Sequence, residues 1–150
     1  MQSRHAVRLA QTLLNTHGLQ TWGIHLDHAR TRCGACHYNT RRISLSRHFV
    51  ALNTSAEVRA TLLHEIAHAL AGPGQGHGPR WQAIARRIGA PVEATNGTAQ
   101  MPLPAWALRC QHCRSVVARR HRRVLNLERV RCRACGEVYG RLSWERSDSL

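Results

Sequence analysis

The sequence predicts an α+β fold, in which a small helix-and-strand domain is followed by a β-rich segment that holds four cysteines. Two observations predict the first part: Trp22, Ile24 and Leu26 alternate as in a half-buried strand, and TSAEVRATLL opens a helix. A third observation predicts the second part: the composition changes near Arg109, where two CxxC pairs and many arginines begin. At 150 residues, the chain has room for one ordinary core and a small appendage.

The first element is expected to be a helix that starts at a Ser3 cap and stops at Gly18, with Val7, Ala10 and Leu14 on one apolar stripe. The same residues superficially suit a mitochondrial presequence, since they hold arginines and no acid. We favour the folded helix because neither a secretory hydrophobic region nor a cleavage site is evident.

A β-hairpin is expected after the strand around Ile24. RCGACHY and RRISLS each have the pattern of a short strand, and the turn-prone pair Asn39-Thr40 joins them. These segments predict a small sheet ahead of the central helix.

The central helix is expected to begin at Thr54, which has capping-box spacing with Glu57, and to end at Gly72-Pro73. Residues 79–88 predict a further helix with a proline at its first position.

The charge balance predicts a polyanionic partner. The chain carries 22 basic against 8 acidic residues, a net charge of +14, and every basic residue is arginine. Such an excess points to nucleic acid, and the planar guanidinium suits phosphate. A GC-rich genome would explain arginine in place of lysine, but not the excess of base over acid.

No membrane segment is expected, because no stretch approaches the ~20 apolar residues that a span needs. Because no secretory region is evident either, we expect an intracellular protein, cytoplasmic and associated with the nucleoid if the source is bacterial. In that compartment, six cysteines favour metal ligands or free thiols over disulfides. We also expect a monomer.

The stretch HEIAH predicts a zinc site. His64 and His68 are one helical turn apart, so both imidazoles can reach one metal ion. Glu65 lies beside them and can polarise a metal-bound water without being a ligand. Three protein ligands would leave a fourth position for that water.

The third ligand is expected to be His77. The break at Gly72-Pro73-Gly74 reverses the chain, and glycines on both sides of His77 leave the backbone free to return over the helix. Glu93 is the rival ligand, although it lies in a proline-flanked stretch without helical character. The metzincin spacing H-x-x-G-x-x-H does not fit.

The HExxH helix, GHGPRW, RRISLS and the late cysteine pairs together resemble the SprT-like metalloproteases, the family that includes Spartan. The resemblance covers nearly the whole chain. It implies a zincin-like domain, zinc held by His64, His68 and His77, and Glu65 as the catalytic base. It also implies DNA-associated proteolysis, in particular of proteins crosslinked to DNA. The loop between His68 and His77 is very short for this family.

The late cysteines predict a structural zinc site. Cys110-x2-Cys113 and Cys132-x2-Cys135 are separated by 18 residues, which matches the spacing of a closed four-thiolate site. A segment this short cannot bury a sufficient hydrophobic core, so it needs a bound metal ion or a crosslink to stabilise its fold. The alternative is four free buried thiols.

The segment between the cysteine pairs, RSVVARRHRRVLNLERVR, predicts an arginine-rich hairpin. Residues 109–150 hold 11 arginines against 4 acids, which favours contact with nucleic acid. Neither a recognition helix nor a platform of several aromatic residues is visible, so we expect sequence-independent binding to single- or double-stranded DNA. The expected contacts are Arg119, Arg120, Arg122 and Arg123.

CGACH, from Cys33 to His37, formally matches the signature of c-type haem attachment. Half of a metal site or a redox pair are further alternatives. We favour ordinary strand thiols, because the stretch forms one arm of the expected hairpin. A further hypothesis places Cys36 near the active cleft.

We expect residues 1–96 to form the metalloprotease domain, residues 97–108 a linker or strap, and residues 109–150 a basic zinc ribbon.

The predicted function is zinc-dependent proteolysis of DNA-bound proteins, with one catalytic and one structural Zn²⁺. Tyr38 and Arg80 are candidates for oxyanion stabilisation. One alternative is a non-enzymatic nucleic-acid-binding protein whose histidine site is structural. The other is a hydrolase of a different substrate class.

Overall fold

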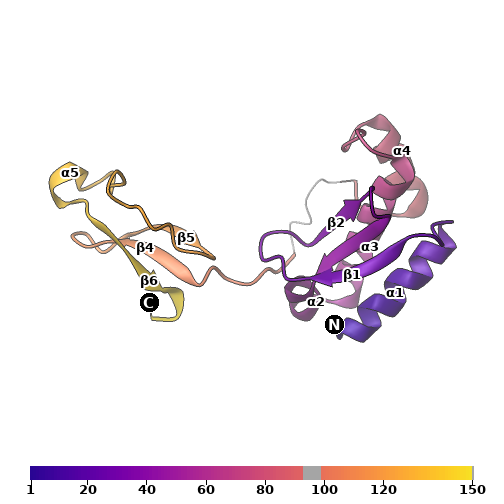
Figure 1. The fold of residues 1–150 in the computed structure, drawn as a ribbon, viewed down its shortest axis with the longest axis horizontal. Helices are drawn as coiled ribbons and strands as arrows, with labels where there is room; N and C mark the ends of the chain where they lie inside the picture. Colours follow the sequence, from indigo (N-terminus) through magenta and orange to yellow (C-terminus); the bar gives the residue numbers. More distant parts are fainter. Residues whose placement is uncertain (93–98, 150) are drawn as a thin grey trace. The chain divides into compact units, whose positions relative to one another are not determined.

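The chain forms two compact units, Met1–Pro102 and Leu103–Leu150, which we call the N-terminal and C-terminal units. The computed structural model describes residues 1–92 and 99–149 (Figure 1). The N-terminal unit contains α1 (Ser3–Thr16), β1 (Gly23–Asp27), β2 (Gly34–His37), β3 (Arg42–Ser46), α2 (Arg47–Leu52), α3 (Ser55–Ala71) and α4 (Pro79–Ile88). The C-terminal unit contains β4 (Trp106–Cys110), β5 (Val116–Arg120), α5 (Gly136–Tyr139), β6 (Leu142–Arg146) and the 3₁₀ turn η1 (Ser147–Ser149). The predicted α+β class is confirmed.

The N-terminal sheet has the strand order β1-β3-β2. β2 and β3 are antiparallel, as the predicted hairpin requires, while β1 runs parallel to β3. β2 is therefore at one edge of the sheet, antiparallel to the central strand. That edge lies next to α3, because β2 and α3 are in contact.

The core of this unit lies on one face of the sheet. Ile43 and Leu45 are fully buried there, and they pack with Leu14 of α1 and Ile66 of α3. α1 runs beside β1 (Figure 1). Burying these aliphatic side chains fixes α3 against the sheet, because each one contributes roughly 1.5–3 kcal/mol when removed from water.

The ends of the helices follow local sequence signals, with one exception. The capping box of Thr54 and Glu57 is present at the start of α3, and α4 begins at its predicted proline. The prediction of a Ser3 cap is wrong, because Ser3 is already helical and the N-cap is Gln2, which makes no side-chain cap bond. The N-terminal ammonium anchors this end instead, since it donates to the carbonyls of Val50 (2.9 Å) and Asn53 (3.0 Å).

The C-terminal unit has an antiparallel sheet of order β5-β4-β6. We predicted a hairpin between the cysteine pairs, and this is wrong, because β5 pairs with β4 on the other side of the first pair. The Cys110-x2-Cys113 knuckle itself makes the turn, and the Cys110 N–H donates to the Ser115 carbonyl at 3.0 Å. β4 starts at Trp106, so the last residues of the expected linker belong to a strand.

Among the helices of residues 1–92 and 99–149, none has both the length and the apolarity that a membrane crossing requires.

Candidate metal centre

Three imidazole rings converge at the C-terminal half of α3. The Nε2 atoms of His64, His68 and His77 are 3.0–3.3 Å apart in all three pairings. A tetrahedral zinc ion with Zn–N bonds of about 2.0–2.1 Å places its ligand nitrogens about 3.3–3.4 Å apart. The three histidines therefore fit one face of a zinc coordination tetrahedron.

The short loop after α3 brings His77 back to the helix. Gly72, Gly74 and Gly76 have φ values of +89°, +78° and +48°, a region that side chains with a Cβ rarely adopt. The Gly78 N–H donates to the Gln75 carbonyl at 2.9 Å and closes the turn just before α4. Alternate glycines thus reverse the chain within few residues, which is why so short a loop suffices.

Trp81 of α4 packs against all three histidine rings. Its ring centroid lies 4.8 Å from that of His64, 5.2 Å from His68 and 4.5 Å from His77. Trp81 is fully buried, and its indole N–H has no hydrogen-bond acceptor among the described residues. From the sequence, Trp81 was predicted only as part of the GHGPRW motif and of the helix over residues 79–88, and not as a contact of the histidines. One feature of the sequence could have indicated this contact: Trp81 follows His77 by four residues, on the first turn of α4.

Burial keeps His64 and His68 in the neutral form that binds metal. Removal from water lowers the pKa of His64 to about 4, with a further contribution from the neighbouring imidazoles, and burial likewise lowers the pKa of His68. The ring of His64 also hydrogen-bonds the backbone of Pro91. Proline has no N–H, so its carbonyl accepts this bond, and because Nε2 faces the other histidines, Nδ1 is the donor. This bond leaves the Nε2 lone pair of His64 free for a metal.

Glu65 lies beneath the edge strand β2, and its residue is only 8% exposed. A Cβ added to Gly34 would come within 3.1 Å of the Glu65 Cγ and 3.2 Å of its Oε1. A Cβ at this point of β2 would crowd the Glu65 carboxyl, so glycine gives that side chain more room. Burial raises the pKa of Glu65 to about 7, and the charge of Arg32 opposes this rise.

The two candidates for oxyanion stabilisation lie in different surroundings. The Tyr38 hydroxyl donates to the His68 carbonyl at 3.2 Å, so it ties the end of β2 to the metal-binding helix. Arg80 is exposed on the first turn of α4. The rival zinc ligand Glu93 lies outside the described residues.

The thiols of CGACH are both free, and Cys36 is on β2 as the strand interpretation expected. Burial, together with the charge of Glu65, raises the pKa of Cys36 to about 12. Cys33 is half-buried, and its sulfur contacts that of Met101 at 3.9 Å. Cys36 thus lies near Glu65, a placement that depends on the packing of β2 on α3.

The second cluster consists of the four late cysteines, whose sulfur atoms all lie within 4.8 Å of one another. The sulfurs of Cys113 and Cys132 are 3.8 Å apart, the separation of about 3.8 Å that tetrahedral Zn–S bonds of 2.3 Å produce. Hydrogen bonds with Ser115 and then with Cys135 lower the pKa of Cys113 to about 6, whereas the bond with Cys113 raises the pKa of Cys135 to about 12, so within this pair Cys113 is the thiolate and Cys135 keeps the proton. The geometry fits a closed structural zinc site formed by Cys110, Cys113, Cys132 and Cys135.

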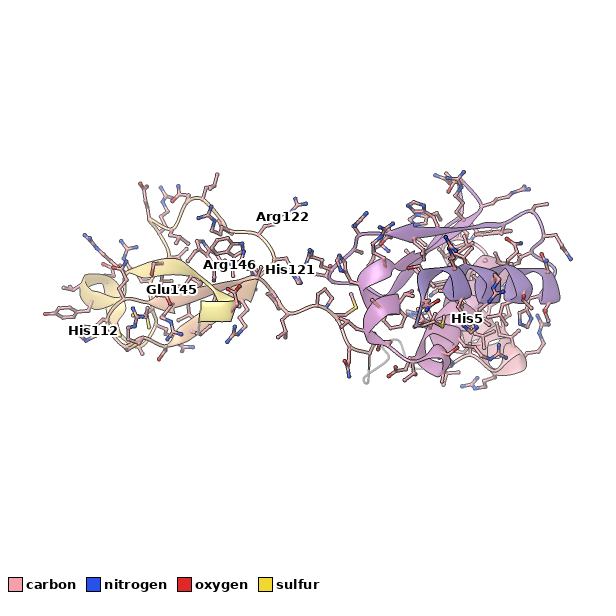
Figure 2. All side chains as sticks on the ribbon, turned by 90° about the horizontal axis from the view of Figure 1, so that it is seen from below. His5, His112, His121, Arg122, Glu145 and Arg146 are labelled. Carbon is pink, nitrogen blue, oxygen red and sulfur yellow. The ribbon has the colours of Figure 1, made fainter. Side chains whose placement is uncertain are left out.

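The four arginines expected to contact DNA are all exposed, but they do not share one face. Arg119 and Arg120 are consecutive on β5, so their side chains leave opposite faces of the strand. The Arg123 guanidinium lies 4.5 Å from the centre of the Trp106 ring, a cation–π contact. Arg122 extends from the following loop away from the strands (Figure 2).

One exposed aromatic pair lies at the α5 end of the C-terminal unit. The rings of His112 and Tyr139 are 5.2 Å apart, and Tyr139 is 63% exposed (Figure 2).

An α+β fold that gathers three imidazoles at one point and four thiols at another defines a protein with two candidate zinc sites. A sequence profile of the SprT-like family matches residues 2–101. The chain belongs to the SprT-like family, which confirms the family predicted from its motifs. No curated protein matches the chain.

Proposed function

We propose that the protein is a zinc-dependent metalloprotease. The observation that supports this most directly is the convergence of three Nε2 atoms at 3.0–3.3 Å, next to a buried glutamate on the same helix. A zinc ion held by these histidines would polarise the scissile carbonyl and acidify a bound water. Within the described residues, the cluster comprises only these three candidate ligands, which favours a position open to water over a closed structural site.

Glu65 is proposed to be the general base. Its carboxylate would take a proton from the attacking water and pass it to the leaving amine. Burial favours the second transfer in particular, because it raises the pKa of this carboxyl above its usual range and so makes the group a better carrier of the proton. The burial that raises this pKa comes from β2 lying over the side chain.

DNA is the proposed partner, and DNA-bound or DNA-crosslinked proteins are the proposed substrates. The support is the net charge of +14, the exposed arginines of the C-terminal unit and the membership of the SprT-like family. Phosphate contacts of this kind are independent of sequence. A protease with little selectivity of its own would then act where a polyanion holds it beside its target.

The experiment is a cleavage assay on a DNA-binding protein, with zinc-loaded enzyme, with and without DNA. We expect DNA to stimulate cleavage and chelation to abolish it. Replacing Arg119, Arg120, Arg122 and Arg123 with Ser should reduce the stimulation but keep zinc at the histidine site. Equal cleavage with and without DNA at low salt would refute the proposed role of DNA, and cleavage that survives complete removal of zinc would refute the metalloprotease.

A further inference from the structure

The excess of positive charge is not confined to the C-terminal unit. Residues 1–102 and residues 103–150 each contain 11 arginines and four acids. The N-terminal unit therefore attracts a polyanion as strongly as the zinc ribbon does, if net charge alone is considered.

The described acids of the N-terminal unit are engaged within the unit. Asp27 forms an ion pair with Arg32 at 2.6 Å. Glu57 closes the capping box of α3, and Glu65 is buried under β2. Of these three carboxylates, only that of Asp27 lies on the sheet face described next, where Arg32 balances its charge.

One face of the N-terminal sheet points away from the core. Ile43 and Leu45 of β3 face the helices, so Arg42 and Ser44 face the opposite side. The register places Arg42 between Gly23 of β1 and His37 of β2. A Cβ on Gly23 would lie 3.7 Å from the Arg42 Cγ, so the stem of this arginine lies across β1.

The centre of this outward face is a small polar network. Ser44 lies between His25 and Ala35 in the register, and it is only 2% exposed. Arg32 donates to the Ser44 hydroxyl at 3.2 Å, and the His37 ring hydrogen-bonds it at 3.0 Å. Around this centre, His25, His37 and Arg42 are exposed, and so is Arg41 in the adjoining turn.

We propose that this outward face, defined by His25, His37, Arg41 and Arg42, is a second nucleic-acid contact that binds the phosphodiester backbone. Arg41 and Arg42 form no ion pair among the described residues, so both guanidinium groups are available. The residues between these donors have small side chains that project little from the sheet. The strand positions of this face carry no Trp, Tyr or Phe on which a base could stack. Such a surface reads phosphates and not bases.

This inference rests on the proposed DNA partner and adds a contact on the catalytic unit. The test is the salt dependence of binding of the full zinc-loaded chain to a labelled DNA duplex, followed by fluorescence anisotropy. The variant combines Arg41→Asn with Arg42→Ser. Asparagine is chosen because Arg41 has a φ of +48°, which Asn tolerates better than most residues.

The pair variant should flatten the slope of log affinity against log salt by about 1.8, because each phosphate contact contributes about 0.9 on duplex DNA. The matched control is Arg86→Ser with Arg87→Ser, which removes the same charge from α4, a helix that packs on α3. The control should leave the slope unchanged. Cleavage of a peptide without DNA should be equal in all three proteins, since none of these arginines belongs to the metal centre.

Two outcomes would overturn the proposal. An unchanged slope in the pair variant would show that the outward face makes no contact, and an equal loss in the control would show an effect of net charge only. The quadruple arginine variant of the C-terminal unit separates this failure from a failure of the proposed function. If that variant alone flattens the slope, DNA binding stands without the outward face, whereas a wild-type chain that does not bind DNA refutes both.

Discussion

Trp81 links the packing of the core to the metal centre. It is fully buried and touches all three imidazoles, so it restricts their rotation before any metal binds. Ligands held in place in this way lose less conformational entropy when zinc binds.

We predict that Trp81→Phe weakens zinc binding at the histidine site by about tenfold, the lower end of the range for residues that orient ligands. Phenylalanine leaves a smaller ring against the histidines, but it also removes the buried unpaired indole N–H, which limits the loss of stability. The measurement is competition with a chromophoric chelator, with thermal unfolding as the control for folding. An unchanged zinc affinity in a folded variant would mean that Trp81 only fills the core.

The residues that the sequence predicted best are those whose relation is local. His64 and His68 are one turn apart on a helix, and glycines bracket His77, so spacing alone indicated that the three could meet. Gly34 and Cys36 are distant from Glu65 in sequence, and they reach it only because β2 packs on α3. No periodicity in the sequence encodes that contact.

At the scale of elements, α3 supplies two of the three histidines and Glu65. Its first turn is closed by the reciprocal bonds of Thr54 and Glu57: the Thr54 N–H donates to the carboxylate at 2.8 Å, and the Glu57 N–H donates to the hydroxyl at 3.3 Å. The metal ligands lie in the last two turns, far from this cap.

We predict that Thr54→Ala lowers the free energy of unfolding by about 1 kcal/mol, because it removes the side-chain acceptor of the cap. Urea denaturation of the zinc-loaded protein measures this. Thr54→Ser, which keeps the hydroxyl, should retain most of the stability, and both variants should bind the same amount of zinc. A loss of zinc in the alanine variant would contradict the view that the cap stabilises the helix without shaping the site.

Elements were predicted well where short-range signals define them and poorly where distant segments pair. The capping box, the proline at the start of α4 and the turn at Asn39-Thr40 are all local, and all three are present. The hairpin expected after the first cysteine pair is absent, because β4 supplies the partner for β5 across the knuckle. The adjacent β-branched residues Val116 and Val117 indicate that a strand can form, but they do not select the strand with which it pairs.

At the scale of the whole molecule, the two candidate zinc sites differ in kind. The histidine site has three neutral ligands, whereas the cysteine site would be closed by four thiolates. The C-terminal unit has a small core around Leu108, Cys110, Cys132 and Leu142, so its folding should depend on its metal.

We predict two zinc ions per chain, of which mild chelation removes the one at the histidine site first. Elemental analysis after graded chelation measures this. Combining Cys110→Ser with Cys113→Ser should leave one zinc and unfold the C-terminal unit, because the two remaining cysteines cannot hold the structural zinc on which this unit depends. A single zinc in the wild-type protein, or none in the double variant, would contradict the assignment of two independent sites.

The most direct test of the central claim compares zinc-loaded wild-type protein with Glu65→Gln in one peptide-cleavage assay, with zinc content measured on the same samples. The account predicts that the wild type cleaves and that the variant binds the same two zinc ions without cleaving, because glutamine cannot accept the proton of the attacking water. Cleavage by the Glu65→Gln variant at the wild-type rate would contradict the account.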